Sequence, residues 1–359
     1  MIARELLPLF CFGFDGTEVP EHIRRLLGEG LGGIILLKRN LQDLEQICAL
    51  TASLHRHAAG PLLVGVDQEG GRVVRLPTPF LAPPPAAALG RIGDPELTRD
   101  VARAVGLELR AAGFNWNLVP VLDVHTNPAN PIIGDRAFSH DPDCVTRMGL
   151  ATLRGFQDAG ILTTGKHFPG HGQTAADSHL TLPESPQSAE RWREVEFFPF
   201  REAIRAGIPS ILAAHLVCPA LDPNAPSSLS HVVITDILRG ELGFDGVVIS
   251  DDMEMGAIVT RFDIGEAAVR FLEAGGDLIL VCKDADLQQK SLAAVEDAVC
   301  RERLSEARLE SSRDRVRGIR ARYALNEHER VRNAANSIVG NPTHARLLES
   351  IRTRTLGPS

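Results

Sequence analysis

The stretch Gly246-Val247-Val248-Ile249-Ser250-Asp251 is an almost uninterrupted apolar run that ends in a carboxylate. A short run of this kind, without alternation of polar and apolar residues, is typical of a strand buried on both faces in a parallel sheet. Seven similar runs are spread along the chain, and most of them precede a longer amphipathic segment. The predicted strands are residues 7–12, 33–37, 62–67, 115–118, 161–164, 210–214, 246–250 and 277–281.

The segments between these runs carry the periodicity of helices. The predicted helices cover residues 21–28, 41–57, 95–112, 141–159, 189–205, 235–242, 264–274 and 285–301. Eight strands that alternate with eight helices predict the α/β class and a single (β/α)8 TIM-type barrel. An open doubly wound sheet is the alternative, but residues 12–16 lack the G-x-G-x-x-G pattern that it would place after the first strand.

The chain continues beyond the eighth unit. One more helix, rich in arginine, is predicted over residues 305–323, and its charges are typical of a solvated face. Residues 1–325 are therefore assigned to the catalytic barrel. Residues 326–359, interrupted by Gly340-Asn341-Pro342, are expected to form a short C-terminal helical extension with a frayed end.

Composition narrows the possible partners and compartments. The formal charge of −8 without a long basic run argues against nucleic acid as a partner. Six scattered cysteines without C-x-x-C pairs are typical of buried thiols in a reducing compartment, so we expect a cytoplasmic protein. No apolar run approaches the roughly 20 residues of a membrane helix, and no cleavage site follows the N-terminal apolar stretch. We expect a monomer that needs no cofactor.

Residues 166–179, KHFPGHGQTAADSH, contain three histidines, a lysine and an aspartate. Their glycines and proline argue against a helix and predict a long loop after the strand at residues 161–164. Asp177 precedes His179 by two positions, so its carboxylate is placed to fix the tautomer of the imidazole and raise its basicity. A single loop histidine is more often a turn former, but this concentration of ionisable groups favours a functional site.

Polar residues also follow the other predicted strands, and in a barrel these ends form the active site. Asp251 ends the strand at residues 246–250 and is therefore a rigidly held, partly desolvated candidate nucleophile. Asp252 is expected to point elsewhere and cap the next segment. A carboxylate facing a proton donor, here His179 assisted by Asp177, predicts glycoside hydrolysis with retention of configuration. Further charged residues at this rim, Asp67 and Arg75 among them, suit a polyhydroxyl substrate.

Four motifs together resemble the family 3 glycoside hydrolases, in particular their single-domain bacterial β-N-acetylhexosaminidases that recycle cell-wall fragments. They are VDQEGGRV at residues 66–73, KHFPGHG at 166–172, DSH at 177–179 and SDDM at 250–253. The likeness covers roughly residues 5–325. The chain departs from the pattern at Ala137, where a serine is usual, and residues 326–359 have no recognised counterpart.

The resemblance implies a role for each site residue. Asp251 forms the covalent glycosyl-enzyme, and His179 with Asp177 serves as acid and base. The residues implied to hold the sugar hydroxyls and the N-acetyl group are Asp67, Arg75, Arg136, Lys166 and His167. Broad-specificity relatives take a glutamate acid from a second domain, so the histidine pair on the barrel loop favours an N-acetylglucosaminidase over a β-glucosidase.

The implied function is a retaining exo-β-N-acetylglucosaminidase that releases terminal GlcNAc from peptidoglycan fragments, such as GlcNAc-1,6-anhydroMurNAc peptides. A phosphorylase is the nearest alternative, since an imidazole acid/base does not repel phosphate as a carboxylate does. A non-catalytic sugar-binding barrel is disfavoured because the nucleophile, the histidine pair and the sugar-binding positions occur together. A metal hydrolase is disfavoured because the loop histidines lack H-E-x-x-H spacing, and no metal is expected.

Overall fold

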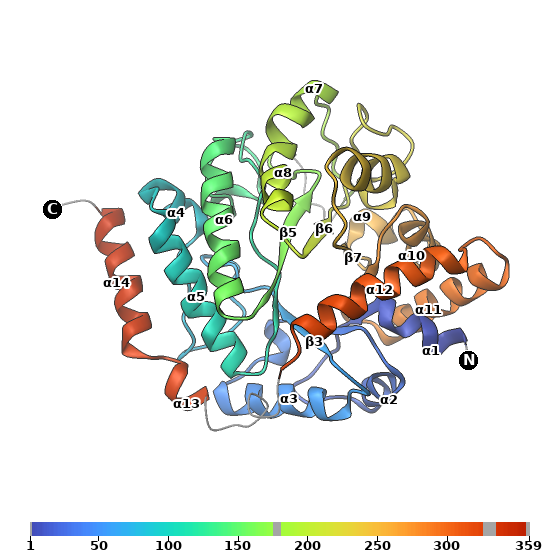
Figure 1. The fold of residues 1–359 in the computed structure, drawn as a ribbon, viewed down its shortest axis with the longest axis horizontal. Coiled ribbons are helices and arrows are strands. Elements are labelled where there is room, and N and C mark those ends of the chain that lie inside the picture. Colours follow the sequence, from blue (N-terminus) through green and yellow to red (C-terminus); the bar gives the residue numbers. More distant parts are fainter. Residues whose placement is uncertain (1, 175–180, 326–334, 357–359) are drawn as a thin grey trace.

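The structure of the chain, a computed structural model, describes residues 2–174, 181–325 and 335–356. Eight parallel strands form a closed barrel in which each strand pairs with its neighbours in sequence and β8 pairs with β1 (Figure 1). The strands are β1 (Phe10–Phe12), β2 (Gly33–Leu36), β3 (Leu63–Val66), β4 (Trp116–Asn117), β5 (Leu162–Phe168), β6 (Ser210–Ala213), β7 (Val247–Asp252) and β8 (Leu278–Val281). The predicted (β/α)8 barrel is confirmed.

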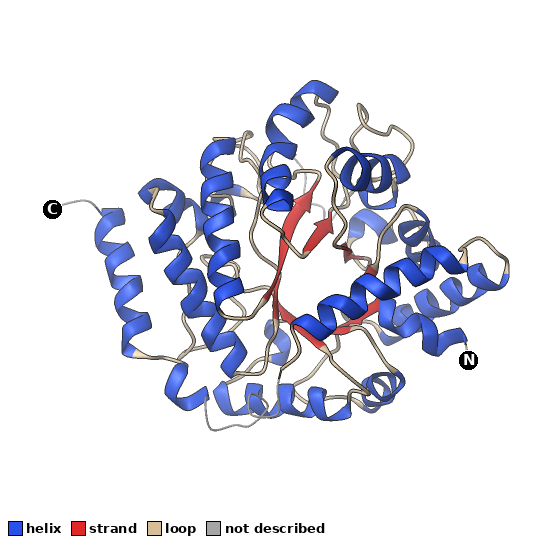
Figure 2. Cartoon of the chain, viewed as in Figure 1, coloured by secondary structure: helices blue, strands red, loops and turns tan. Residues whose placement is uncertain are grey.

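Helices surround the barrel (Figure 2). They are α1 (Ile2–Leu6), α2 (Glu21–Glu29), α3 (Leu44–His57), α4 (Ala86–Ile92), α5 (Pro95–Ala111), α6 (Pro142–Asp158), α7 (Ala189–Arg191), α8 (Phe197–Arg205), α9 (Gly256–Val259), α10 (Ile264–Glu273), α11 (Ala285–Cys300), α12 (Glu306–Arg322), α13 (Ala335–Ile338) and α14 (Pro342–Leu356). Short 3-10 turns cover Leu7–Leu9, Lys38–Asn40, Gly134–Arg136 and Ser227–Leu229, and π-helical segments cover Trp192–Glu196 and Val232–Glu241. Across the described ranges, no helix combines the length and the apolar character needed to cross a membrane.

Local sequence explains where many of these helices begin. Aspartates or serines precede α3, α5, α6, α7, α10, α11 and α12, and their side chains accept hydrogen bonds from N–H groups of the first turn. Such caps satisfy donors that a helix start otherwise leaves without a partner. Asp43, Asp94 and Asp141 are three of them.

Two strand boundaries differ from the prediction by three residues or more. Residues 7–9 form a 3-10 turn, and the strand begins only at Phe10. Strand β5 does not end at Thr164 but continues to Phe168, because Lys166 pairs through its backbone with Pro120 and Leu122 of the segment after β4. Gly165 lies inside this strand, where a Cβ would come within 2.8 Å of the Ile208 side chain. It therefore permits close packing and does not break the strand.

The C-terminal extension packs along the outside of the barrel, with α14 beside α4 and α5 (Figure 1). Its anchor is Glu108 of α5, whose side chain is 2% exposed. The carboxylate accepts from Leu81 N at 2.7 Å, Gly340 N at 3.2 Å and His344 Nδ1 at 2.7 Å. Glu108 thus joins the extension to the long connection after β3, which carries part of the rim.

Replacing Glu108 by alanine is expected to lower the free energy of unfolding by about 2 to 3 kcal/mol, because buried N–H donors lose their acceptor. Urea denaturation measures this change. Arg354→Ala is the control: it removes a half-exposed ion pair between α14 and Asp94, and it should change stability by about 0.5 kcal/mol or less. Equal small effects of both substitutions would show that Glu108 does not anchor the extension.

Candidate active site

The described candidate residues gather at the C-terminal rim of the barrel. Asp67 follows β3, and Lys166 and His167 belong to the last part of β5. Arg136 ends the 3-10 turn that follows β4, and Asp251 lies near the end of β7. Strand ends bring these residues together because parallel strands of a barrel all finish at the same rim.

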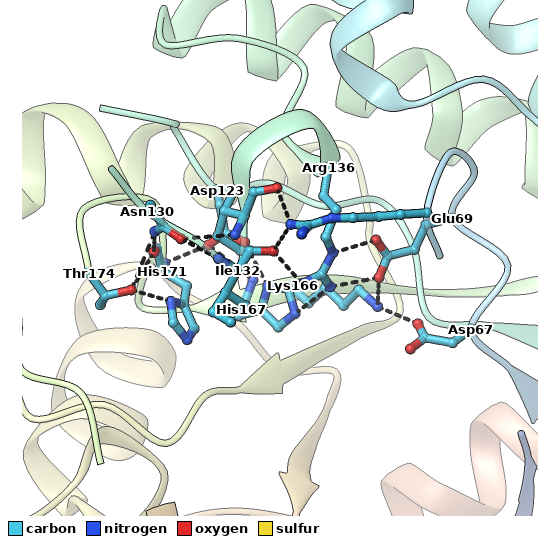
Figure 3. Close-up of polar contacts among 12 residues, drawn as sticks. Asp67, Glu69, Asp123, Asn130, Ile132, Arg136, Lys166, His167, His171 and Thr174 are labelled. Atoms are coloured by element: carbon cyan, nitrogen blue, oxygen red, sulfur yellow. Dashed lines mark hydrogen bonds and ion pairs between the residues drawn. The ribbon is translucent and has the colours of Figure 1, made fainter. Parts of the chain in front are cut away.

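Glu69 lies at the centre of a buried charge cluster (Figure 3). Its carboxylate receives two hydrogen bonds from Arg136, both at 2.8 Å, and lies 2.5 Å from Lys166 Nζ. Lys166 also pairs with Asp67, which is 21% exposed against 6% for Glu69. Burial acts to raise the pKa of Glu69, but attraction to Lys166 and Arg136 outweighs it and holds that pKa well below its usual range. Glu69 is therefore ionised and fixes both cations at the rim.

Arg75 lies at the open side of this cluster. Its Nη2 is 3.5 Å from Asp67 Oδ2, and its side chain is partly exposed. The Arg75 N–H donates to Gln68 Oε1 at 2.8 Å, which fixes the backbone of the connection next to Asp67. Asp67 and Arg75 therefore offer an acceptor and a donor side by side, an arrangement that suits vicinal hydroxyls.

Asp123, fully buried after β4, anchors the start of the loop that follows β5. Its Oδ2 accepts from His167 Nδ1 at 2.6 Å, and its Oδ1 accepts from His171 N at 2.6 Å. Burial acts to raise the pKa of Asp123, but attraction to His167 and the hydrogen bonds from both histidines lower it overall. With Nδ1–H directed to Asp123, the other nitrogen of His167 faces Arg136 Nη2 at 3.2 Å.

The imidazole of His171 is buried and uncharged. Burial and the neighbouring His167 lower the pKa of His171 to about 4, so its imidazole is neutral near pH 7. Its Nδ1 lies 2.6 Å from the Thr174 hydroxyl, and its carbonyl accepts from Asn130 Nδ2 at 2.8 Å (Figure 3). These contacts assign His171 to holding the loop in place.

Asp251 is partly exposed at the end of β7, and its Oδ1 accepts from Asp252 N at 2.9 Å. Asp252 caps the following turn, as strand alternation predicts: its Oδ1 accepts from Glu254 N and Cys282 N. Burial and the nearby Glu254 raise the pKa of Asp252 to about 7. His215, fully buried just after β6, lies with Nε2 3.2 Å from the Asp252 carbonyl and contacts the backbone at this strand end.

The predicted acid/base pair, Asp177 and His179, lies outside the described residues. Within the described ranges, no group of three or more His, Cys, Asp or Glu side chains is arranged to hold a metal ion. The described rim supplies a strand-end carboxylate, a second carboxylate at Asp67, and fixed cationic donors. This combination can bind hydroxyls and stabilise charge at a reacting carbon.

The sequence profile of the glycosyl hydrolase family 3 N-terminal domain matches residues 16–319. This chain belongs to glycoside hydrolase family 3. It is therefore a glycoside hydrolase, and the resemblance drawn from the four sequence motifs is confirmed.

Family 3 relatives share both the sequence and the barrel. A protein named beta-hexosaminidase from Thiobacillus denitrificans is 41% identical over 288 residues, which cover 78% of this chain and 80% of that protein. A family 3 β-N-acetylglucosaminidase from Paenibacillus sp. str. FPU-7 is 40% identical, with a TM-score of 0.92 over 99% of this chain and 69% of that one. NagZ from Neisseria gonorrhoeae, solved with N-trifluoroacetyl-D-glucosamine, is 31% identical, with a TM-score of 0.80 over 97% of this chain and 98% of that one.

Two residues of this candidate site, Glu69 and Asp123, received no role from the sequence. Glu69 stands inside the VDQEGGRV motif, and Asp123 follows the predicted strand at residues 115–118 among the polar residues of the rim. The available signal was a charged residue next to an apolar strand end. What the sequence does not show is that Glu69 meets Arg136, 67 positions away.

Replacing Glu69 by glutamine is expected to lower the free energy of unfolding by about 3 to 5 kcal/mol, because the cations of Arg136 and Lys166 lose a buried counter-charge. Chemical denaturation measures the loss, and a fall in kcat/KM should accompany it. Glu96→Gln, at a side chain that is 83% exposed, should stay within about 0.5 kcal/mol of the wild type. A Glu69→Gln protein as stable as this control would contradict the central role of Glu69.

Proposed function

We propose that the chain is a retaining exo-β-N-acetylglucosaminidase that releases terminal GlcNAc from peptidoglycan fragments, such as GlcNAc-1,6-anhydroMurNAc peptides. The observation that supports the proposal is the shared rim: Asp251 lies near the end of β7, at the same end of the barrel as Asp67 and Lys166, and its charge acts on the pKa of His171 in the loop after β5. The relatives named beta-hexosaminidase and β-N-acetylglucosaminidase support the choice of sugar.

In the first step, an Asp251 carboxylate oxygen attacks the anomeric carbon while the bond to the leaving group breaks. His179, oriented by Asp177, gives its proton to the departing oxygen, so the aglycone leaves as a neutral alcohol. In the second step, His179 takes a proton from water, and the water oxygen displaces Asp251 from the same carbon. Two displacements restore the original configuration.

The charged cluster holds the sugar during both steps. We assign the hydroxyls and the N-acetyl group to Asp67, Arg75, Arg136, Lys166 and His167. Asp123 and Glu69 act on the sugar indirectly, by orienting the side chains that contact it. Asp123 orients His167, and Glu69 orients Lys166 and Arg136. We also propose that the protein is a monomer and lies in the cytoplasm. The free state of all six cysteines, five of which are buried, supports a reducing compartment.

Hydrolysis of p-nitrophenyl β-GlcNAc beside the matching β-glucoside tests the choice of sugar. A clear preference for the N-acetylated substrate is expected, and equal rates would overturn it. Running the reaction in phosphate buffer separates hydrolysis from phosphorolysis, because the first product is GlcNAc and the second is GlcNAc-1-phosphate.

Replacing Asp251 by asparagine is expected to lower kcat on the order of 10³-fold or more while the protein stays folded, because the amide cannot form the glycosyl ester. Initial rates and circular dichroism measure the two quantities. Asp252→Asn is a useful comparison, since Asp252 caps a turn and should affect stability more than chemistry. Near wild-type turnover of Asp251→Asn would remove Asp251 from the nucleophile role.

Replacing His179 by alanine should reduce kcat/KM by about 10²-fold or more for a substrate with a sugar alcohol as leaving group. For an aryl glycoside with a very acidic phenol the loss should be about tenfold or less, because that leaving group needs little protonation. The comparison of the two substrates is the measurement. Equal losses would mean that His179 orients the loop without transferring a proton.

A further inference from the structure

Glu196 is an unusual carboxyl group on the flank of the active site. Its side chain is fully buried, and neither carboxyl oxygen has a well-formed hydrogen bond within the described ranges, although the Gln187 side chain lies near enough to act on its pKa. Buried polar groups in folded proteins nearly always have partners, so an exception calls for an explanation.

The local structure directs Glu196 inward. It ends the π-helical turn Trp192–Glu196, in which Trp192 and Glu196 are buried while Arg193 and Glu194 are exposed. The next residue, Phe197, stacks on Phe168 at the end of β5, with ring centroids 5.6 Å apart. This stacking places the turn directly against the beginning of the loop after β5.

The carboxyl of Glu196 packs against Gly170 in that loop. A Cβ on Gly170 would come within 2.9 Å of the Glu196 Cβ and 3.1 Å of its Oε2. Gly170 has a φ of 135°, which strongly favours glycine, and its N–H donates to the His167 carbonyl at 2.8 Å. The turn at residues 167–171 is thus held by Asp123 through hydrogen bonds and by Glu196 through contact.

Burial and a neighbouring acid favour the neutral form of Glu196, and they outweigh the opposing effects of Arg191 and Gln187. Burial, and then the negative charge of Asp123, raise the pKa of Glu196 to about 7. The buried Cys218 thiol lies near it on the β6 side, and burial together with Glu196 raises the pKa of that thiol far above its usual value. Arg191 is the nearby cation, with Nη2 3.9 Å from Oε1 and a side chain that is 42% exposed. His167 and His171 are the ionisable residues of the turn at residues 167–171 itself, and both are bonded to Asp123.

We propose that Glu196 is a positioning residue of this active site, whose uncharged carboxyl forms the wall that seats Gly170 and thereby sets the placement of His167 and His171. Ionisation brings a second negative charge close to Asp123 and draws the carboxyl toward Arg191. The support behind Gly170 is then lost, and turnover falls on the alkaline side. The proposal rests on the glycosidase activity of the chain but not on the identity of the sugar.

The first test is the pH dependence of kcat/KM between about pH 5 and about pH 9, measured on whichever aryl glycoside the enzyme hydrolyses. Glu196→Gln keeps a neutral side chain of the same shape at every pH, so its alkaline limb should lie higher than that of the wild type by about half a pH unit or more. Glu194→Gln, on the exposed side of the same turn, is the matched control and should reproduce the wild-type profile. An unchanged alkaline limb in Glu196→Gln, or loss of activity at all pH values, would overturn the proposal.

A second measurement needs no substrate and therefore stands apart from any failure of the proposed function. A carboxyl whose pKa is higher in the folded than in the unfolded state binds more protons when folded, so its contribution to stability is lost as pH rises. Between about pH 4.5 and about pH 7, wild-type stability should fall relative to that of Glu196→Gln and then level off. Parallel stability curves would show that Glu196 is not held neutral.

A third variant separates positioning from packing. Glu196→Ala removes the wall behind Gly170 and should lower kcat about tenfold or more, with little change in KM, because bound sugar then meets a displaced site. Hydrogen exchange should rise at residues 167–171. If the folded fraction of Glu196→Ala retains wild-type kcat, the residue is only part of the packing and the proposal is wrong.

Discussion

The buried ion cluster around Glu69 is the constraint on which the rim depends. One carboxylate receives a forked pair of hydrogen bonds from Arg136 and also contacts Lys166, so it joins the chain segments after β3 and β4 to β5. Burying three charges is unfavourable unless each is fully paired, and here the pairing is close to complete. The cations that we propose to hold the sugar are therefore fixed before binding, which would reduce the entropy lost on binding.

A second layer of contacts fixes the loop after β5. Asp123 holds His167 and His171, and Asn130 ties the preceding segment to the same loop. The fit is tight at Gly172, where a Cβ would come within 1.8 Å of the Val124 carbonyl oxygen. This glycine permits close approach of two backbones, a role that differs from the breaker role suggested by its place in the sequence.

The surroundings shift the pKa values of four carboxyl groups near this rim in opposite directions. Glu69 and Asp123 lie beside cations or histidines that stabilise the charged form, and their pKa values fall below the usual range. Loss of contact with water, and then the charge of neighbouring acids, raises the pKa of Glu196 and of Asp252 to about 7. Desolvation raises the pKa of all four carboxyls, and only at Glu69 and Asp123 do neighbouring cations or histidines outweigh it.

The order of the elements was determined by the sequence alone. Eight apolar runs separated by amphipathic segments predicted the barrel. The positions of Asp67, Lys166 and Asp251 after predicted strands indicated that they lie at its rim. Helix starts followed from capping residues such as Asp94 and Asp141. What only the tertiary structure decided is which charges meet: Glu69 with Arg136, Asp123 with His167, Glu108 with His344 and Glu196 with Gly170. Each pair joins positions far apart in the chain or on separate elements, so no local sequence pattern predicts the contact. Local patterns indicate periodicity and turn chemistry. Burial and charge pairing arise only when the barrel closes.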